Sequence, residues 1–93
     1  MSENISILLV DDQTLFREGL YTILSVQPGL VVVGEAANGQ EALTQAQALQ
    51  PQVILMDLRM PVLDGVAATR QLRTVAPQSR VIVLTTFDED EYV

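Results

Sequence analysis

The fold is decided by the stretch Val53-Ile-Leu-Met-Asp57-Leu-Arg-Met-Pro61-Val-Leu-Asp-Gly65, in which a run of four apolar residues ends abruptly at a carboxylate. Such a run, followed by an acid and by a loop that contains proline and glycine, predicts a buried strand that carries Asp57 to the edge of a sheet. Open α/β sheets bind their ligands beyond the carboxyl ends of their strands. Asp57 is therefore a candidate site residue.

Three further apolar runs have the same character, and segments with helical spacing of apolar residues lie between the four runs. The three runs are Ile5–Val10, Leu30–Val33 and Val81–Leu84, and the helical patterns begin near Thr14, Asn38 and Asp64. The short connections between them require parallel strands with right-handed crossovers. The sequence therefore predicts an α/β fold built on an open parallel sheet.

The composition indicates one small soluble domain. The chain has 93 residues, 48% of them hydrophobic, and no apolar run approaches the length of a membrane span. Its N-terminus has no basic segment followed by an apolar block, so we expect no secretory signal. It also contains no cysteine, which excludes disulfides and thiolate metal sites. We therefore expect a cytoplasmic protein with no membrane partner.

The charge balance narrows the chemistry further. Twelve acids against five bases give a net charge of −7, which opposes direct nucleic-acid binding by this segment. All five bases are arginine, since the chain contains neither lysine nor histidine. Schiff-base chemistry and imidazole catalysis are excluded on that ground. Carboxylates and hydroxyls remain as the reactive groups.

Acids and a hydroxyl follow three of the predicted strands. Asp11 and Asp12 close the first run, Asp57 closes the third, and Thr85 follows the fourth. The carboxyl ends of parallel strands lie at one edge of a sheet, so these groups should converge. Clustered carboxylates repel one another unless a hard cation such as Mg²⁺ binds between them, and a carboxylate beside the cation can attack phosphorus. Taken singly, the pair after the first strand also fits a helix cap, and Asp57 fits a turn residue.

The three motifs together resemble the receiver domain of two-component response regulators, and most closely the subfamily with a helix-turn-helix output domain. They are Leu-Val-Asp11-Asp12, the run from Val53 to Gly65, and Val-Leu-Thr85-Thr86, which follow one another in the family's order across the whole chain. The resemblance implies a flavodoxin-like open parallel sheet with strand order 2-1-3-4. It also implies a signalling module and not an enzyme.

The same resemblance implies roles for individual residues. Asp57 would accept the phosphoryl group, and Thr85 would be the switch hydroxyl. Mg²⁺ would be bound directly by Asp12, partly through water by Asp11, by Asp57, and by the backbone carbonyl of Arg59. The implied phosphodonor is a phosphohistidine on a sensor histidine kinase, and the implied role of the full-length protein is regulation of transcription.

The family also has a fifth strand, which carries a lysine, and a fifth helix that covers the sheet. Neither is found in residues 1–93, and we therefore expect a single truncated receiver domain. Without them, Val81–Leu84 would be an exposed apolar strand at the sheet edge. Such edges pair with other chains, which predicts a homo-oligomer formed through this strand.

Three other functions compete with this interpretation. One is an inactive fragment that only self-associates. Another is a phosphatase of the haloacid-dehalogenase type, which needs a second Asp two residues after the nucleophile; after Asp11 that position is Gln13. The last is a flavin or nucleotide-binding module, whose phosphate loop after the first strand would be rich in glycine and hydroxyls, whereas Asp11 and Asp12 would repel phosphate.

Overall fold

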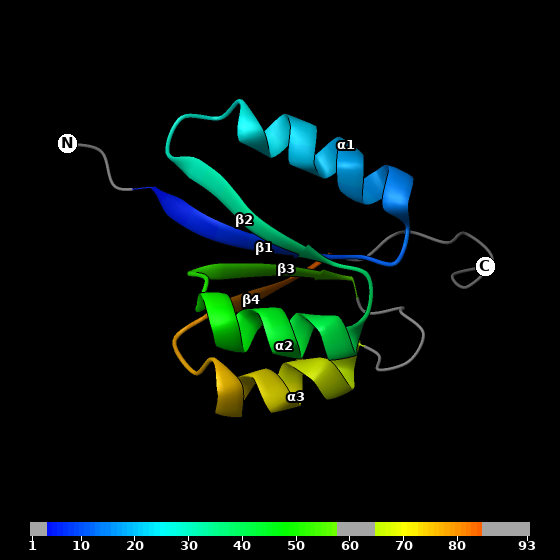
Figure 1. Ribbon diagram of the computed structural model, residues 1–93, viewed down its shortest axis with the longest axis vertical. Coiled ribbons are helices and arrows are strands. Elements are labelled where there is room, and N and C mark those ends of the chain that lie inside the picture. Colours follow the sequence, from blue (N-terminus) through cyan, green and yellow to red (C-terminus); the bar gives the residue numbers. More distant parts are fainter. Residues whose placement is uncertain (1–3, 58–64, 85–93) are drawn as a thin grey trace.

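The protein forms a four-stranded parallel sheet with helices on both faces, as the computed structural model in Figure 1 shows; it describes residues 4–57 and 65–84. Along the chain the elements are β1 (Ile5–Val10), α1 (Thr14–Ser25), β2 (Leu30–Ala36), α2 (Gly39–Leu49), β3 (Val53–Asp57), α3 (Gly65–Val75) and β4 (Arg80–Leu84). The strand order β2-β1-β3-β4 confirms the predicted fold class. None of the described helices has both the length and the apolar character needed to cross a membrane.

The two central strands are the apolar runs that the sequence singles out. β1 and β3 pair in parallel, with Leu8 beside Ile54 and Leu9 beside Leu55. β1 and β3 each have a neighbouring strand on both sides, and helices pack on the faces of the sheet. Side chains on both faces of these two strands can therefore be apolar without contact with solvent. Leu8, Leu9 and Ile54 are accordingly inaccessible to solvent. Parallel alignment also brings the carboxyl ends of both strands to the same edge.

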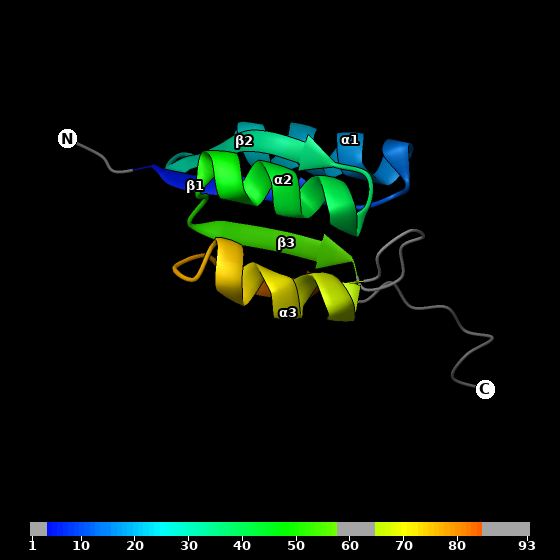
Figure 2. The ribbon, with the colours of Figure 1, turned by 60° about the horizontal axis from the view of Figure 1, so that its bottom comes forward.

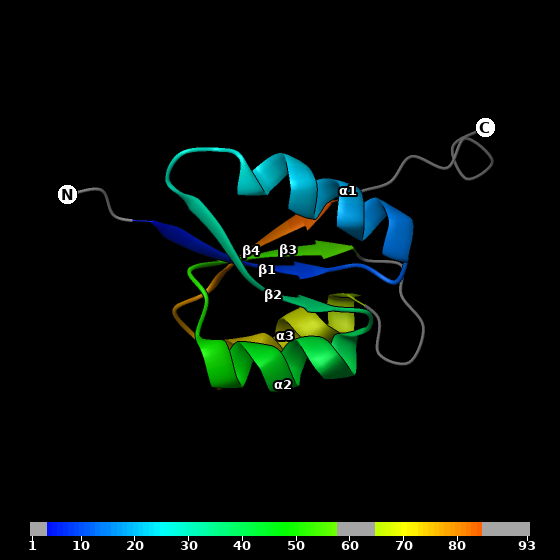
Figure 3. The same ribbon diagram turned by 45° about the horizontal axis from the view of Figure 1, so that its top comes forward.

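The two faces of the sheet are covered unequally. Figure 2 shows α2 and α3 side by side in front of the sheet with α1 behind it, and Figure 3 shows α1 alone on its side. The main core lies on the side with two helices, where small residues of the helices let them approach the strands. Its buried members are Leu8, Val10, Ala36, Ala42, Leu43, Ala46, Ile54, Met56, Ala68, Leu72 and Ala76.

The helix α1 forms where its apolar spacing predicts, but it buries no residue completely. Leu15 is 84% exposed and Ile23 is 59% exposed. The helix packs mainly on β2 and β1, at one side of the sheet. Ile82 of β4, whose neighbour in register is Leu55, stays half exposed. This helix therefore covers only part of its face of the sheet.

The second strand was predicted incorrectly at its C-terminal end and in its burial. The sequence predicts a buried strand that ends at Val33, whereas β2 continues to Ala36, because Glu35 and Ala36 pair with the last residues of β1. The register shifts between Ile7 and Leu8 of β1. Val33 is 37% exposed because β2 is an edge strand of the sheet.

Gly34 allows α2 to lie close to β2. A Cβ atom at this position would lie 2.8 Å from Cδ1 of Leu49 and 3.2 Å from Cδ1 of Leu8, and it would also overlap the side-chain oxygen of Gln45. The Gln45 amide donates a hydrogen bond to the carbonyl of Glu35, which joins α2 to this strand. A side chain at position 34 would therefore compete with this helix–strand contact.

The helix α2 begins where the sequence predicts, and Asn38 is its N-cap residue. Asn38 Oδ1 accepts a hydrogen bond from the backbone N–H of Glu41 at 2.8 Å. The Glu41 side chain accepts one from the N–H of Ala37 at 2.9 Å, one residue before the partner expected in a capping box. Both bonds fix the loop that leaves β2.

Candidate functional site

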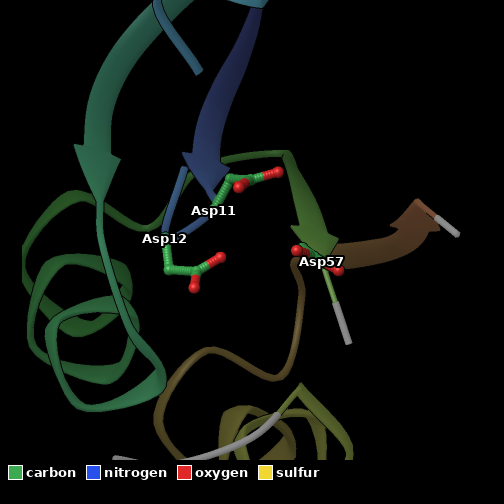
Figure 4. Close-up of side chains that lie close together, drawn as sticks. All are labelled: Asp11, Asp12 and Asp57. Carbon is green, nitrogen blue, oxygen red and sulfur yellow. The ribbon is translucent and has the colours of Figure 1, made fainter. Parts of the chain in front are cut away.

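Two carboxylates lie at the carboxyl edge of the two central strands. Asp57 is the last residue of β3, and Asp11 directly follows the last residue of β1. The backbone N–H of Asp11 donates to the carbonyl of Ala36 at 3.0 Å, so the β1–β2 ladder extends into the site. Figure 4 shows these side chains with that of Asp12, which comes from the turn between β1 and α1.

The three carboxylates form one cluster. One oxygen from each of Asp11, Asp12 and Asp57 lies within 4.8 Å of the oxygens of the other two. Asp11 is 2% exposed and Asp57 is 4% exposed, while Asp12 is exposed at the mouth of the cluster. The predicted convergence of the acids at one sheet edge is therefore confirmed.

The hydrogen bonds of Asp11 exclude the interpretation of the acid pair as a helix cap. The N-cap residue of α1 is Gln13, which makes no capping bond with its side chain. Asp11 Oδ1 instead accepts from the backbone N–H of Gln13 at 2.8 Å, in a short turn that precedes the helix. Asp11 Oδ2 is buried and has no hydrogen-bond partner among the described residues.

The electrostatics of the cluster disfavour the charged form of Asp11. Burial raises the pKa of its carboxyl above the ordinary value, while the hydrogen bond from Gln13 lowers that pKa. The negative charges of Asp57 and Asp12 raise the pKa further, and the guanidinium of Arg17 lowers it. A cation between the carboxylates would relieve both the burial cost and the mutual repulsion.

The donor set fits a Mg²⁺ ion. All three candidate ligands are carboxylate oxygens, which hard divalent cations prefer. A buried carboxylate oxygen without a hydrogen-bond partner is costly unless a cation or donor satisfies it, and Asp11 Oδ2 is such an atom. Asp12 is exposed, so solvent reaches this carboxylate, and Mg²⁺ usually retains several waters.

The remaining predicted site residues lie outside the described part of the chain. These are Thr85, the predicted switch hydroxyl, and Arg59, whose carbonyl is a predicted metal ligand. Asp64, near which the sequence predicts the third helix to begin, also lies outside the described residues. The helix α3 itself is confirmed, with Ala68 and Leu72 facing the core.

Two residues that the sequence did not single out also lie at this edge. Arg17 of α1 donates through Nε to Oε1 of Glu35 at 3.0 Å and through Nη1 to the carbonyl of Asp11. Their signal in the sequence is weak: an arginine one helical turn after Gln13, and a glutamate near the end of the next strand. The sequence indicates this ion pair only through the opposite charges of Arg17 and Glu35, which both lie near the same predicted edge of the sheet.

The structure thus combines a parallel sheet of order β2-β1-β3-β4 with a cluster of three carboxylates at the carboxyl ends of its two central strands. The family model for the response regulator receiver domain matches residues 7–93, and the chain belongs to that family. Receiver domains of this family are the phosphate-accepting modules of two-component signalling. The predicted family and its general function are thereby confirmed.

Named relatives support the same assignment. The chain is 47% identical over 89 residues to the response regulator protein VraR of Staphylococcus aureus, an alignment that covers 96% of this chain and 43% of VraR. The homologous protein of Staphylococcus epidermidis is 46% identical over the same length. The chain thus spans less than half the length of these curated relatives.

Solved receiver structures share the fold. The response regulator domain of Thermotoga maritima CheB superposes with a TM-score of 0.87 at 39% identity, covering 94% of this chain and 65% of that domain. The signal receiver domain of the putative response regulator NarL from Mycobacterium tuberculosis gives a TM-score of 0.85 at 37% identity, with coverages of 98% and 73%.

Proposed function

We propose that this chain accepts a phosphoryl group on Asp57 from a phosphohistidine of a sensor histidine kinase, with Mg²⁺ bound by Asp11, Asp12 and Asp57. The observation that carries the proposal is the carboxylate cluster, with its buried oxygen of Asp11 that lacks a hydrogen-bond partner. Membership of the receiver family supports the phosphoacceptor role. The position of Asp57, at the end of a buried central strand, supports its choice as the acceptor.

The proposed reaction is a direct transfer. A carboxylate oxygen of Asp57 attacks phosphorus and forms a P–O bond while the P–N bond to the donor imidazole breaks. The electron pair of that bond goes to the imidazole nitrogen, which takes a proton from water, and Asp57 becomes an acyl phosphate. When bound, Mg²⁺ supplies positive charge that offsets the charge on the phosphoryl oxygens.

Residues outside the described part of the chain complete the proposed site. We assign the backbone carbonyl of Arg59 as a further Mg²⁺ ligand and the hydroxyl of Thr85 as the group that responds to the phosphoryl group. Both assignments rest on the family motifs in the sequence.

The partners proposed for the longer protein follow from the family. Regulation of transcription would belong to an output domain, since the net charge of −7 opposes direct nucleic-acid binding by these 93 residues. The cytoplasm is the compartment proposed for the exchange with the kinase, as the sequence also predicts.

We also propose that this chain self-associates through β4. This strand is at the edge of the described sheet, and Ile82 and Val83 are 50% and 42% exposed. Their side chains point to opposite faces of the strand, so each face leaves some apolar surface exposed. Exposed apolar edge strands favour pairing with a second copy.

The chemical proposal is tested by incubating the chain with Mg²⁺ and a small acyl-phosphate donor, followed by intact mass measurement. One phosphoryl adduct is expected on the wild type and none on Asp57→Asn. Chelation of the divalent ion with EDTA should also prevent the adduct. A wild-type chain without an adduct, under conditions in which a solved receiver domain is modified, would contradict the proposal.

A further inference from the structure

Arg17 connects three elements at the edge that carries the acidic cluster. It lies near the start of α1, and its side chain is only 15% exposed. Its guanidinium binds the Glu35 carboxylate on β2 and the backbone carbonyl of Asp11 at the end of β1. The planar guanidinium offers donors in several directions, so one side chain serves both acceptors at once.

Glu35 is itself held in place. In register it neighbours Leu9 of β1, and its carbonyl accepts a hydrogen bond from the Gln45 side chain of α2. The next residue, Ala36, accepts the backbone N–H of Asp11 at 3.0 Å. The anchor of Arg17 is therefore a strand that also binds the backbone of Asp11.

These contacts leave one atom of Asp11 for a ligand. Its backbone N–H binds Ala36, its carbonyl binds Arg17, and its Oδ1 binds the N–H of Gln13. Only Oδ2 has no hydrogen-bond partner among the described residues, and the Asp11 carboxylate to which it belongs is part of the cluster. The Asp11 carbonyl is part of the peptide that leads to Asp12, so the bond from Arg17 holds the backbone from which both carboxylates project.

We propose that Arg17, held by Glu35, is a positioning residue for the acidic site: it fixes the Asp11–Asp12 peptide so that both carboxylates face Asp57 and bind Mg²⁺ together. This inference rests on the metal site of the proposed function. Partners that orient metal ligands typically change metal affinity by about tenfold to a hundredfold when they are removed.

The direction in which Mg²⁺ affinity changes when Arg17 is replaced distinguishes a positioning role from a purely electrostatic one. Arg17 carries a positive charge close to the proposed cation site, so removing that charge should by itself tighten Mg²⁺ binding. A positioning role predicts weaker Mg²⁺ binding. Without Arg17, the carboxylates of Asp11 and Asp12 would be less ordered, and ordering them on Mg²⁺ binding would cost part of the binding free energy. Weaker binding after loss of a positive charge is therefore specific to positioning.

The test is calorimetric titration of the folded chain with Mg²⁺, with thermal unfolding measured in parallel. Arg17→Met should weaken Mg²⁺ binding about tenfold or more. Arg17→Lys, which keeps the charge but has a single donor group, should recover part of the affinity. Glu35→Gln, which leaves Arg17 in place but removes its ionic anchor, should also weaken binding, but the lost negative charge acts in the same direction, so the Arg17 variants decide between the two causes.

Two variants act as matched controls. Arg73→Met removes the same charge from an exposed position in the last turn of α3, at the end of the helix remote from the cluster. Gln45→Met removes a hydrogen bond to the backbone carbonyl of Glu35, while the pairing of Glu35 with Leu9 and the carboxylate that binds Arg17 remain. Both should retain wild-type Mg²⁺ affinity, even where Gln45→Met lowers the unfolding temperature.

The outcomes distinguish this inference from the proposed function. A wild-type chain that does not bind Mg²⁺ would overturn both. Wild-type binding together with equal or tighter binding by Arg17→Met would overturn the positioning role alone. If Arg17→Met does not fold, the comparison of Arg17→Lys with the controls decides the matter, because this variant keeps the charge; affinity equal to that of the wild type would overturn the role.

Discussion

Asp11 and Asp57, far apart in the sequence, bring carboxylate oxygens within 4.8 Å of each other at the ends of two neighbouring strands. Without a cation, this proximity destabilises the folded state, because both groups are buried. We expect Asp11→Asn to increase the free energy of unfolding at neutral pH by on the order of 1 kcal/mol. The side-chain oxygen of the asparagine would still accept the hydrogen bond from the backbone N–H of Gln13. Denaturant unfolding in EDTA measures the change.

The pH dependence of this gain follows from the raised pKa of Asp11. A carboxyl whose pKa is higher in the folded state favours folding below its unfolded pKa, and it loses that contribution as the pH rises through the folded pKa. The advantage of Asp11→Asn should therefore be present at neutral pH and disappear in acid. A variant less stable than the wild type at neutral pH without metal would contradict this prediction.

Gly34 should resist substitution because α2 lies against it. Gly34→Ala would displace the Gln45 side chain from Glu35 and press on Leu49, at an expected cost of about 1 kcal/mol. Both displaced groups are the ends of flexible side chains, so the fold should survive. Chemical denaturation monitored by circular dichroism provides the measurement.

Gly19→Ala is the matched control for this substitution. Gly19 lies within α1, and an added Cβ there meets no atom within 4 Å. The change should stabilise the protein by about 0.5–1 kcal/mol, because alanine favours the helix. Equal effects at positions 19 and 34 would show that the close approach of α2 has no energetic consequence.

The exposed strand β4 predicts concentration-dependent self-association. Static light scattering should show a dimer or larger species at micromolar concentration. Ile82→Lys should shift the population towards monomer, since a charge on the edge opposes strand pairing. Leu15→Lys places the same charge on α1, where the original leucine is 84% exposed, and should not do so. A wild type that remains monomeric from micromolar to millimolar concentration would refute the prediction.

The sequence predicted the parts of the fold that depend on local patterns. The apolar runs of β1 and β3 determine central strands, and Asn38 with Glu41 marks the start of α2. The acidic cluster was predictable because strand ends in a parallel sheet meet at one edge. The strand order required the family resemblance, since short crossovers alone allow several orders.

Features that depend on register and neighbours were not predictable in the same way. The extension of β2 past Gly34 follows from its pairing with Leu9 and Val10, which no local pattern encodes. The link from Arg17 to Asp11 depends on how α1 is placed over the sheet. The exposure of Leu15 depends on what else covers that face, although its helical spacing resembles that of a buried stripe.

The acceptor residue can be identified directly. Borohydride reduces an aspartyl phosphate to homoserine, and trypsin would then cut this lysine-free chain only after arginine. Asp11 and Asp12 fall in the peptide that ends at Arg17, while Asp57 is the only aspartate in the peptide from residue 18 to Arg59. After phosphorylation with Mg²⁺ and an acyl-phosphate donor, we predict homoserine at position 57 alone. Homoserine at position 11 or 12, or an unmodified peptide 18–59, would contradict the assignment of Asp57 as the phosphoacceptor.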